Sequence, residues 1–462
     1  MAFFAIDCKR ICPGGNPGVR TGCYSPEGEI VTSPIRASRR LRLLTSALGG
    51  WLFFATPTLL YAQPVTVDLW RHESADAELV ANLAAIERFN QQQDSWFVRV
   101  ETLPQGSYTE SITAAALAGQ LPCIFDADQP VIPNFAWSGH LMPLDQLLPG
   151  NLLNQLLPGA TGEYKGTPYS VGQFDVALAL FALRSELEKF GIRQASMEAP
   201  YSHRELMEIL QQIKADQPGS FPIDINSRFD GEWISYGYGP WLQSGGADLI
   251  DRISMTRADG VLNSEAAAGV ALWYQSLFEQ RLAERQPVDD QAFTQGRALL
   301  HYTGSWYAQQ YADRFGDDLV IMPPPDFGQG PVVGSGSWHW AVSSSCDYPD
   351  AASDFLSFLL SDTEIAAMSD ATGMIPVTGS AASLTRRYHA EGDWRIFYDY
   401  VRAYAVPRPE TPAYPKISAA FEKAMLDIKF GRNIQQALDI AVDSIEYDIH
   451  RNRGYGFFEE SP

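Results

Sequence analysis

The stretch VTVDLWRHESADAELVANLAAIERFNQQQDSWFVRV, residues 65–100, contains the pattern that decides the fold. Its first six residues alternate apolar and polar side chains and are partly β-branched, which predicts a strand. Residues 77–91 then place leucine, isoleucine and phenylalanine at helical spacing, and residues 96–103 return to strand character. A strand–helix–strand order of this kind predicts a parallel sheet with helical crossovers.

The rest of the chain continues this mixture of strands and helices. Further strands are predicted at residues 124–125, 176–183, 298–302 and 339–343. Further helices are predicted at residues 108–118, 201–214, 264–281, 350–360, 363–371 and 414–430. No low-complexity linker interrupts the chain, so two lobes would have to be connected by more than one crossing.

Residues 1–62 have the composition of a secretory signal. Basic residues precede an apolar run that begins at Leu43 and ends at the small residue Ala62, which predicts cleavage before Gln63. An uncleaved anchor is the alternative, because about 20 apolar residues can span a bilayer. The general and the twin-arginine export routes both stay open. Residues 1–30 are unlike any signal, and we interpret them as the product of a start codon assigned too early.

The charge of the mature chain excludes two classes of partner. The signal region holds seven basic and three acidic residues, so its removal changes the formal net charge from −21 to about −25. Such a surface repels phosphate backbones and anionic lipid headgroups. Nucleic acid and membrane surfaces are therefore not expected as partners.

Two cysteines, Cys123 and Cys346, remain after cleavage. An exported protein meets an oxidising environment, where the two can form a disulfide. Two buried thiols are equally compatible with the sequence, because residues this far apart along the chain do not define their own pairing.

The sequence lacks the spacings that mark common catalytic centres. It contains no His-Glu-x-x-His, no Cys-x-x-Cys and no phosphate-binding Gly-x-x-x-x-Gly-Lys loop. The segment 334–337, Gly-Ser-Gly-Ser, does not match a nucleophile elbow and is typical of a flexible turn. We therefore predict no catalytic residue, no metal and no cofactor.

Candidate ligand-binding residues lie at strand ends, where open α/β sheets bind their ligands. Arg71, His72 and Glu73 follow the first strand; the alternative for them is a solvated loop. Asp126 and Asp128 leave the third strand, and Asp128 is equally suited to cap a helix.

Other candidates are aromatic or precede a buried strand. Phe174 and Asp175 come directly before the apolar run at 176–183. Four aromatic residues occupy one glycine-rich segment that we interpret as a loop, with at least one of them facing a ligand: Trp233, Tyr236, Tyr238 and Trp241. Trp306 ends a strand and Trp338 begins one, and a tryptophan face suits the apolar face of a sugar ring. Each tryptophan taken alone is more often a core residue.

Several segments occur in a familiar order along the mature chain. They are Glu87-Arg88-Phe89, the small-residue run 114–122, Gly139 to Asp145, Tyr164-Lys165-Gly166-Thr167-Pro168-Tyr169, Phe293 to Ala298 before Gly304-Ser305-Trp306, Thr372 to Pro376, and Arg408-Pro409. In this order they resemble the extracellular sugar-binding proteins of ABC importers, the class that includes maltose-binding protein. One departure is Pro122-Cys123, where that family often has Pro-Asp.

The resemblance implies an α/β, two-lobed periplasmic-binding-protein fold of type II, each lobe a sheet flanked by helices and joined by hinge crossovers. It assigns residues 63–173 plus 312–378 to the first lobe and 174–311 plus 379–462 to the second. It also implies that Trp306 stacks on the ligand and that Arg408 completes the site. The protein would be a monomeric periplasmic binding component that delivers a sugar or polyol to membrane permease subunits, and not an enzyme.

Three alternatives remain open from the sequence. An exported glycoside hydrolase would need two carboxylates, for which Asp126, Asp128 and Asp175 are available. A sensor would deliver its ligand to a receptor instead of a permease. For the ligand, the tryptophans favour a neutral mono- or disaccharide, whereas Arg71, His72 and Arg408 favour an acidic sugar or a phosphorylated polyol.

Overall fold

The stretch at residues 65–100 folds as strand, helix and strand in the computed structural model, which describes residues 63–458. β1 (Val65–His72) is followed by α1 (Asp76–Gln92) and β2 (Trp96–Leu103). β1 pairs in parallel with β2 and with β3 (Ile124–Asp128), as predicted from the order of the elements. The predicted signal region, residues 1–62, lies outside the described residues.

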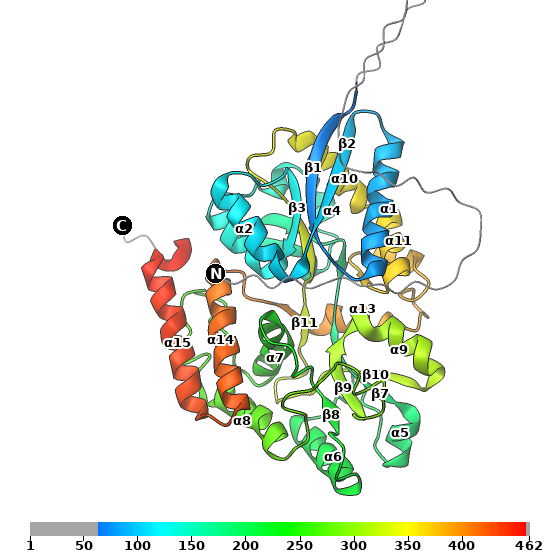
Figure 1. Cartoon of the computed structure of the whole chain (residues 1–462), viewed down its shortest axis with the longest axis vertical. Coiled ribbons are helices and arrows are strands. Elements are labelled where there is room, and N and C mark those ends of the chain that lie inside the picture. The colour runs from blue at the N-terminus through cyan, green and yellow to red at the C-terminus, as the bar shows by residue number, and fades with distance from the viewer. Residues whose placement is uncertain (1–62, 459–462) are drawn as a thin grey trace, which may run out of the picture. The chain divides into compact units, whose positions relative to one another are not determined.

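The first lobe is built on a six-stranded sheet with the order β2-β1-β3-β12-β5-β4. Its other strands are β12 (Trp338–Val342), β5 (Thr167–Val171) and β4 (Thr161–Tyr164). The helices of this lobe are α1, α2 (Tyr108–Ala118), α3 (Ile132–Trp137), α4 (Gly150–Leu153), α10 (Pro349–Leu359) and α11 (Asp362–Thr372) (Figure 1). β12 runs antiparallel to β3, so the return of the chain inserts a strand into the sheet that the N-terminal half began.

Both faces of this sheet are covered by apolar side chains. On one face, Val67 and Leu69 of β1 pack with Phe89 of α1 and Phe355 of α10. On the other face, Phe125 of β3 belongs to a cluster that includes residues of α2 and α3. Alternate residues of a strand point to opposite faces, which is why a sheet buried on both sides needs apolar residues at consecutive positions.

The second lobe is built on a four-stranded sheet with the order β10-β7-β9-β8. Its strands are β10 (Leu319–Met322), β7 (Leu178–Leu183), β9 (Leu300–Gly304) and β8 (Ile223–Asp224). Its helices are α5 (Arg184–Lys189), α6 (His203–Asp216), α7 (Glu232–Ser244), α8 (Glu265–Glu279), α9 (Ala308–Phe315), α14 (Tyr414–Lys429) and α15 (Ile434–Arg451). β7 sends Leu178 and Leu180 into one core cluster and Phe181 into another, as expected for a continuous apolar run.

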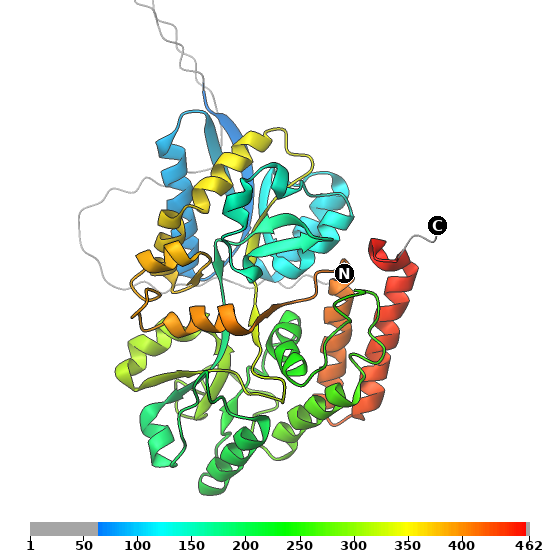
Figure 2. The same cartoon turned by 180° about the vertical axis from the view of Figure 1, so that it is seen from behind.

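Two short ribbons lie where the chain crosses between the lobes. β6 (Phe174–Asp175) pairs with β13 (Ile375–Pro376), and β11 (Val333–Ser335) pairs with β14 (Ala405–Pro407). Between β13 and β14 come α12 (Gly379–Leu384) and α13 (Arg395–Tyr404). Figures 1 and 2 show β11 and α13 between the two sheets from both sides. The chain therefore crosses more than once, as the missing linker predicted.

The second crossing comes later in the chain than the sequence analysis placed it. β10 pairs antiparallel with β7, in the sheet of the second lobe. The assignment of residues from 312 onward to the first lobe is therefore wrong for this strand. Its short apolar sequence carries no signal that distinguishes one sheet from the other, and only its pairing partner does.

The glycine-rich aromatic segment is a helix, α7, and not the predicted loop. Glycine and proline have low helix propensity, but packing overrides it here because Ile234, Tyr238 and Trp241 are buried in the core of the second lobe. Gly237 serves this packing, since a Cβ at that position would lie 2.8 Å from the ring of Trp233. Only Trp233 and Tyr236 of the four aromatic residues are left to contact a ligand.

Cys123 and Cys346 form a disulfide, with 4.4 Å between their Cα atoms. Cys123 precedes β3 and Cys346 follows β12, and these two strands are antiparallel neighbours. The bond therefore joins the adjacent ends of two strands, through cysteines that lie 223 residues apart in the sequence. No helix among residues 63–458 is long and apolar enough to cross a membrane.

Replacing both cysteines by serine (Cys123→Ser with Cys346→Ser) is expected to lower the free energy of unfolding by about 2–5 kcal/mol, because the bond closes a long loop in the unfolded chain. Urea unfolding of the mature protein measures the difference. A reductant should shift the wild-type midpoint toward that of the double variant and leave the variant itself unchanged. Equal midpoints for wild type and variant would contradict a stabilising role.

Candidate functional site

A cavity of about 450 Å³ is lined by residues of both lobes and of the segments that cross between them. The first lobe contributes the carboxyl ends of β1 and β3, the beginning of α1 and the start of β12. The second lobe contributes the start of α7 and the segment after β9. The lining residues are His72, Ser74, Ala75, Glu78, Gln105, Asp128, Phe174, Val176, Glu232, Trp233, Tyr236, Trp306, Gly336, Ser337, Trp338, Met374 and Arg408.

Aromatic rings form two walls of the cavity. Trp338 stacks on the ring of His72, with 3.7 Å between the centroids and 14° between the planes. On the second lobe the ring centroid of Trp306 lies 6.0 Å from that of Tyr236 and 6.4 Å from that of Trp233. The planes of the two tryptophan rings make an angle of 88°. Trp306 can fold over the end of β9 because residue 304 is glycine; a Cβ there would lie 1.9 Å from the indole.

His72 is fixed by Asp126, which lies behind it on the neighbouring strand. The backbone N–H of His72 donates to Oδ1 of Asp126 at 3.0 Å, and Nδ1 of the ring lies 2.6 Å from Oδ2. Both side chains are buried. Asp126 therefore positions the imidazole against Trp338 and is not itself part of the cavity lining.

Arg408 connects the two lobes across the cavity. Its Nη1 and Nη2 donate to the two carboxylate oxygens of Asp128 at 2.9 and 2.7 Å, a bidentate pair with the first lobe. Nη1 also donates to Oε1 of Glu232 of the second lobe at 2.8 Å. The guanidinium lies over the ring of Tyr236, with Cζ 5.1 Å from the centroid. Asp128 is thus an ion-pair partner and makes no side-chain cap for the helix turn that follows it.

Arg71, Glu73 and Asp175 are further predicted residues that do not line the cavity. Arg71 is fully buried and donates to Ser74 at 2.7 Å and to Glu78 at 3.4 Å, so it supports the cavity wall from behind. Glu73 is exposed and does not line the cavity, although its chain neighbours His72 and Ser74 do. Asp175 is fully buried in the crossing segment.

Sequence reasoning missed several lining residues, of which Glu78, Glu232 and Met374 are the most informative. Glu232 begins α7, and interpreting that segment as a loop hid its position next to Trp233. Glu78 lies in the first turn of α1, where an acidic residue is ordinary because of the helix dipole. The segment 334–337 was interpreted as a flexible turn, but its last two residues line the cavity and the first two belong to β11.

Asp175 ties two crossing segments together. Its Oδ1 accepts hydrogen bonds from the backbone N–H groups of Val176 at 2.7 Å and Gly336 at 2.8 Å. Its Oδ2 is buried and has no hydrogen-bond partner among the described residues. Burial raises the pKa of this carboxyl from 3.8 to about 6, against the two N–H donors and Arg408, which lower it.

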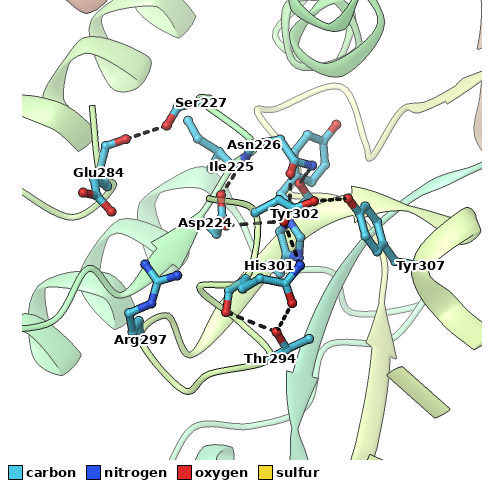
Figure 3. A network of polar contacts seen from close by, with 12 residues as sticks. Asp224, Ile225, Asn226, Ser227, Glu284, Thr294, Arg297, His301, Tyr302 and Tyr307 are labelled. Atoms are coloured by element: carbon cyan, nitrogen blue, oxygen red, sulfur yellow. Dashed lines mark hydrogen bonds and ion pairs between the residues drawn. The ribbon is translucent and has the colours of Figure 1, made fainter. Parts of the chain in front are cut away.

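A second cavity, of about 280 Å³, lies beside β8 and the segment before β9. Figure 3 shows the polar network next to it, in which Asp224, Asn226 and His301 lie close together. Asp224 accepts from the backbone of Asn226 at 2.8 Å, and Nε2 of His301 lies 3.0 Å from Oδ1 of Asn226. Burial lowers the pKa of His301, which keeps the ring neutral. All residues that line this second cavity belong to the second lobe, so a ligand bound there could not contact both lobes.

Metal binding finds no support in the part of the chain that the structure describes. No group of three or more His, Cys, Asp or Glu side chains within residues 63–458 could hold a metal ion. The acidic side chains at the larger cavity are instead held by arginines and hydroxyl groups.

The fold and the cavity define a two-lobed binding protein. The family model of bacterial extracellular solute-binding proteins matches residues 84–393, and the chain belongs to this family. No curated protein sequence matches the chain.

Solved structures with the same fold cover nearly the whole described part. The cyclic alpha-maltosyl-1,6-maltose binding protein of Arthrobacter globiformis is 23% identical with a TM-score of 0.72, covering 84% of this chain and 100% of its own. The GacH receptor of Streptomyces glaucescens is 22% identical with a TM-score of 0.70, covering 84% and 98%. The maltose/maltodextrin-binding domain MalE of Bdellovibrio bacteriovorus is 18% identical with a TM-score of 0.68, covering 84% and 100%. The predicted two-lobed fold is confirmed.

Asp175→Asn is expected to remove a pH-dependent loss of stability. A carboxyl whose pKa is raised on folding favours the folded state below pH 3.8, and this contribution is lost as the pH rises to about 6. A pKa difference of about two units corresponds to about 3 kcal/mol in the free energy of unfolding. The free energy of unfolding of the wild type, relative to Asp175→Asn, should therefore fall by that amount between pH 4 and pH 7.

Urea unfolding at several pH values measures this difference. Asp94→Asn, at an exposed position, is the matched control and should show no such trend. A difference between wild type and Asp175→Asn that does not change with pH would show that the carboxyl titrates normally in the folded protein.

Proposed function

We propose that this protein is the periplasmic solute-binding component of an ABC importer, and that it captures a sugar or related polyol between its lobes. The observation that carries the proposal is the cavity lined from both lobes, with aromatic walls and polar side chains in the same space. Aromatic faces exclude water from the apolar side of a sugar ring, and polar groups replace the water around its hydroxyls. The proposed site residues are His72, Asp128, Phe174, Trp233, Tyr236, Trp306, Trp338 and Arg408, with Glu78 and Glu232 added.

The crossing segments support a hinge mechanism. Short ribbons such as β6–β13 and β11–β14 can absorb a change in backbone angles while the two sheets stay rigid. A ligand that contacts both lobes stabilises the closed form by its higher affinity for that form. Permease subunits would recognise the closed form, so function depends on closure and not on bond breaking.

The ligands named for proteins of the same fold support a saccharide. The three structures described above concern a cyclic maltosyl-maltose, acarbose and maltotriose. Their sequences differ greatly from this chain, so they indicate a class of ligand and no particular sugar. The predicted export signal fits an extracellular role, and we expect the mature protein to act as a monomer.

The hydrolase alternative receives no support from the carboxylates. Asp128 is occupied by Arg408 through both oxygens, and Glu232 accepts from Arg408, Tyr414 and Ser418. Asp126 is bound to His72, and Asp175 does not line the cavity. That leaves only Glu78 among the lining carboxyls, whereas a glycosidase needs one carboxyl free to donate a proton and another free to act on the sugar or on water.

Thermal unfolding of the mature protein, residues 63–462, against sugars, polyols and sugar acids tests the proposed function. A compound that binds only the folded state raises the midpoint by mass action. We expect at least one saccharide to raise it and to be recovered chemically unchanged. A compound that is consumed would support the hydrolase, and a panel without any shift would contradict saccharide binding.

Trp306→Ala is expected to weaken binding of the saccharide found in that panel by about 1–3 kcal/mol, on the scale of a lost aromatic contact. Calorimetry measures the affinity, and circular dichroism confirms that the variant folds. Trp137→Ala is the matched control, because Trp137 is partly exposed on α3 and does not line the cavity. Unchanged affinity in Trp306→Ala would show that this ring does not stack on the ligand.

A further inference from the structure

The charged side chains around the larger cavity contain more acid than base. Of the described residues that line it, Glu78, Asp128 and Glu232 are acidic, and Arg408 is basic. Arg71 stands behind Glu78 and is completely buried. The composition of the lining therefore favours a ligand that brings positive charge.

Arg408 is not available to bind an anionic ligand. Both of its terminal nitrogens donate to carboxylates, Nη2 to Asp128 and Nη1 to Asp128 and Glu232. One guanidinium thus serves two carboxylates, which leaves this group of three side chains with a net negative charge when both acids are ionised. A sugar acid or a phosphate would have to break these bonds and face the two released carboxylates.

The two helices that begin at the cavity each have an acidic residue in the first turn. An N-terminus attracts anions through its free N–H groups and the helix dipole. Glu78 lies in the first turn of α1, and Glu232 lies in the first turn of α7. Acidic side chains of the chain itself therefore already lie near both N-termini, which disfavours a further anion there.

The ionised forms of Glu78 and Glu232 are disfavoured in the cavity wall, and the neighbouring donors offset this only in part. Burial raises the pKa of Glu78 even though Arg71 and His72 lower it, and the nearest nitrogen of Arg71 is 3.4 Å away. Burial also raises the pKa of Glu232, against Arg408, Tyr414 and Ser418, and the charge of Asp128 raises it further. A cation placed between these walls would stabilise the ionised form of both carboxyls.

The aromatic walls can bind the same cation. Trp233, Trp306 and Tyr236 surround one side of the cavity, and Tyr236 already accepts the guanidinium of Arg408 on its face. Indole and phenol faces attract ammonium groups by cation–π interaction. We propose, on the basis of the function proposed above, that the ligand is a saccharide or polyol carrying a protonated amine, and that acidic sugars are excluded. This replaces the neutral sugar favoured by the sequence.

Calorimetry on the mature protein with matched probes tests this proposal. The monosaccharide set is D-glucose, D-glucosamine, N-acetyl-D-glucosamine and D-glucuronate, and the disaccharide set is cellobiose, chitobiose with free amines and its N-acetylated form. In the set that binds, the amine form should bind about tenfold more tightly than its N-acetylated and neutral counterparts, the size of one charge-assisted contact. Glucuronate should not bind. The preference should decrease at high salt, which screens charge.

Variants then assign the preference to this site. Glu78→Gln should reduce the ratio of amine to N-acetyl affinity, because it removes one carboxyl from the lining without changing the shape of the side chain. Glu188→Gln is the matched control, since Glu188 is exposed on α5 and does not line the cavity. If Glu78→Gln does not fold, the comparison of probes on the wild type still decides the question.

The outcomes separate this proposal from the function on which it rests. Equal or tighter binding of the neutral or N-acetylated probes, or binding of glucuronate, overturns the amine preference and leaves saccharide binding intact. No binding by any probe overturns both. An amine preference that is unchanged in Glu78→Gln and in Glu232→Gln overturns the assignment to these two carboxylates.

Discussion

The ion pair between Arg408 and the carboxylates of Asp128 and Glu232 sets the relation between the lobes. Asp128 ends a strand of the first sheet, Glu232 begins a helix of the second lobe, and Arg408 follows β14 of a crossing ribbon. Removing such groups from water is costly unless every partner is in place. The ion pair is therefore stabilising only at the spacing of the lobes that brings all three side chains together. Because these side chains also line the ligand cavity, the spacing of the lobes and the shape of the cavity change together.

The crossing segments carry binding residues as well as the chain. Phe174 belongs to β6, Gly336 and Ser337 follow β11, and Met374 precedes β13, and all four line the cavity. Ser337 donates to the backbone of Phe174 at 2.6 Å, which connects two crossings directly. A rotation of the lobes about these ribbons must therefore move ligand contacts too. Binding and closure use the same residues, which is the physical requirement for a ligand to shift the population of the closed form.

The sequence predicted what local periodicity determines. β2 and α2 have the predicted bounds. Most of the candidate site was also predictable, because strand ends and exposed aromatic residues are where such folds bind ligands.

The errors in the predicted elements and site residues came from tertiary context. α7 contains glycine and proline but is stabilised by burial on nearly every side, and β10 is assigned to its sheet only by pairing with β7. Arg71 and Asp175 have the right position along the chain, but their side chains are buried behind the lining.

Carboxyls with raised pKa values occur in two different roles here, and geometry distinguishes them. Asp175 lies in the crossing segment behind the lining residues, and its bond with the N–H of Gly336 fixes the backbone of a neighbouring crossing. Its ionisation opposes folding, and a ligand in the cavity does not touch it. Glu78 and Glu232 face the cavity from opposite lobes, at helix N-termini that favour their charge. Carboxyls with perturbed pKa values cluster at functional sites. Only a carboxyl that lines a cavity can contact a bound cation, and that contact lowers the cost of ionising it and so increases the affinity. The charge of the lining therefore determines which ligand gains most from closure.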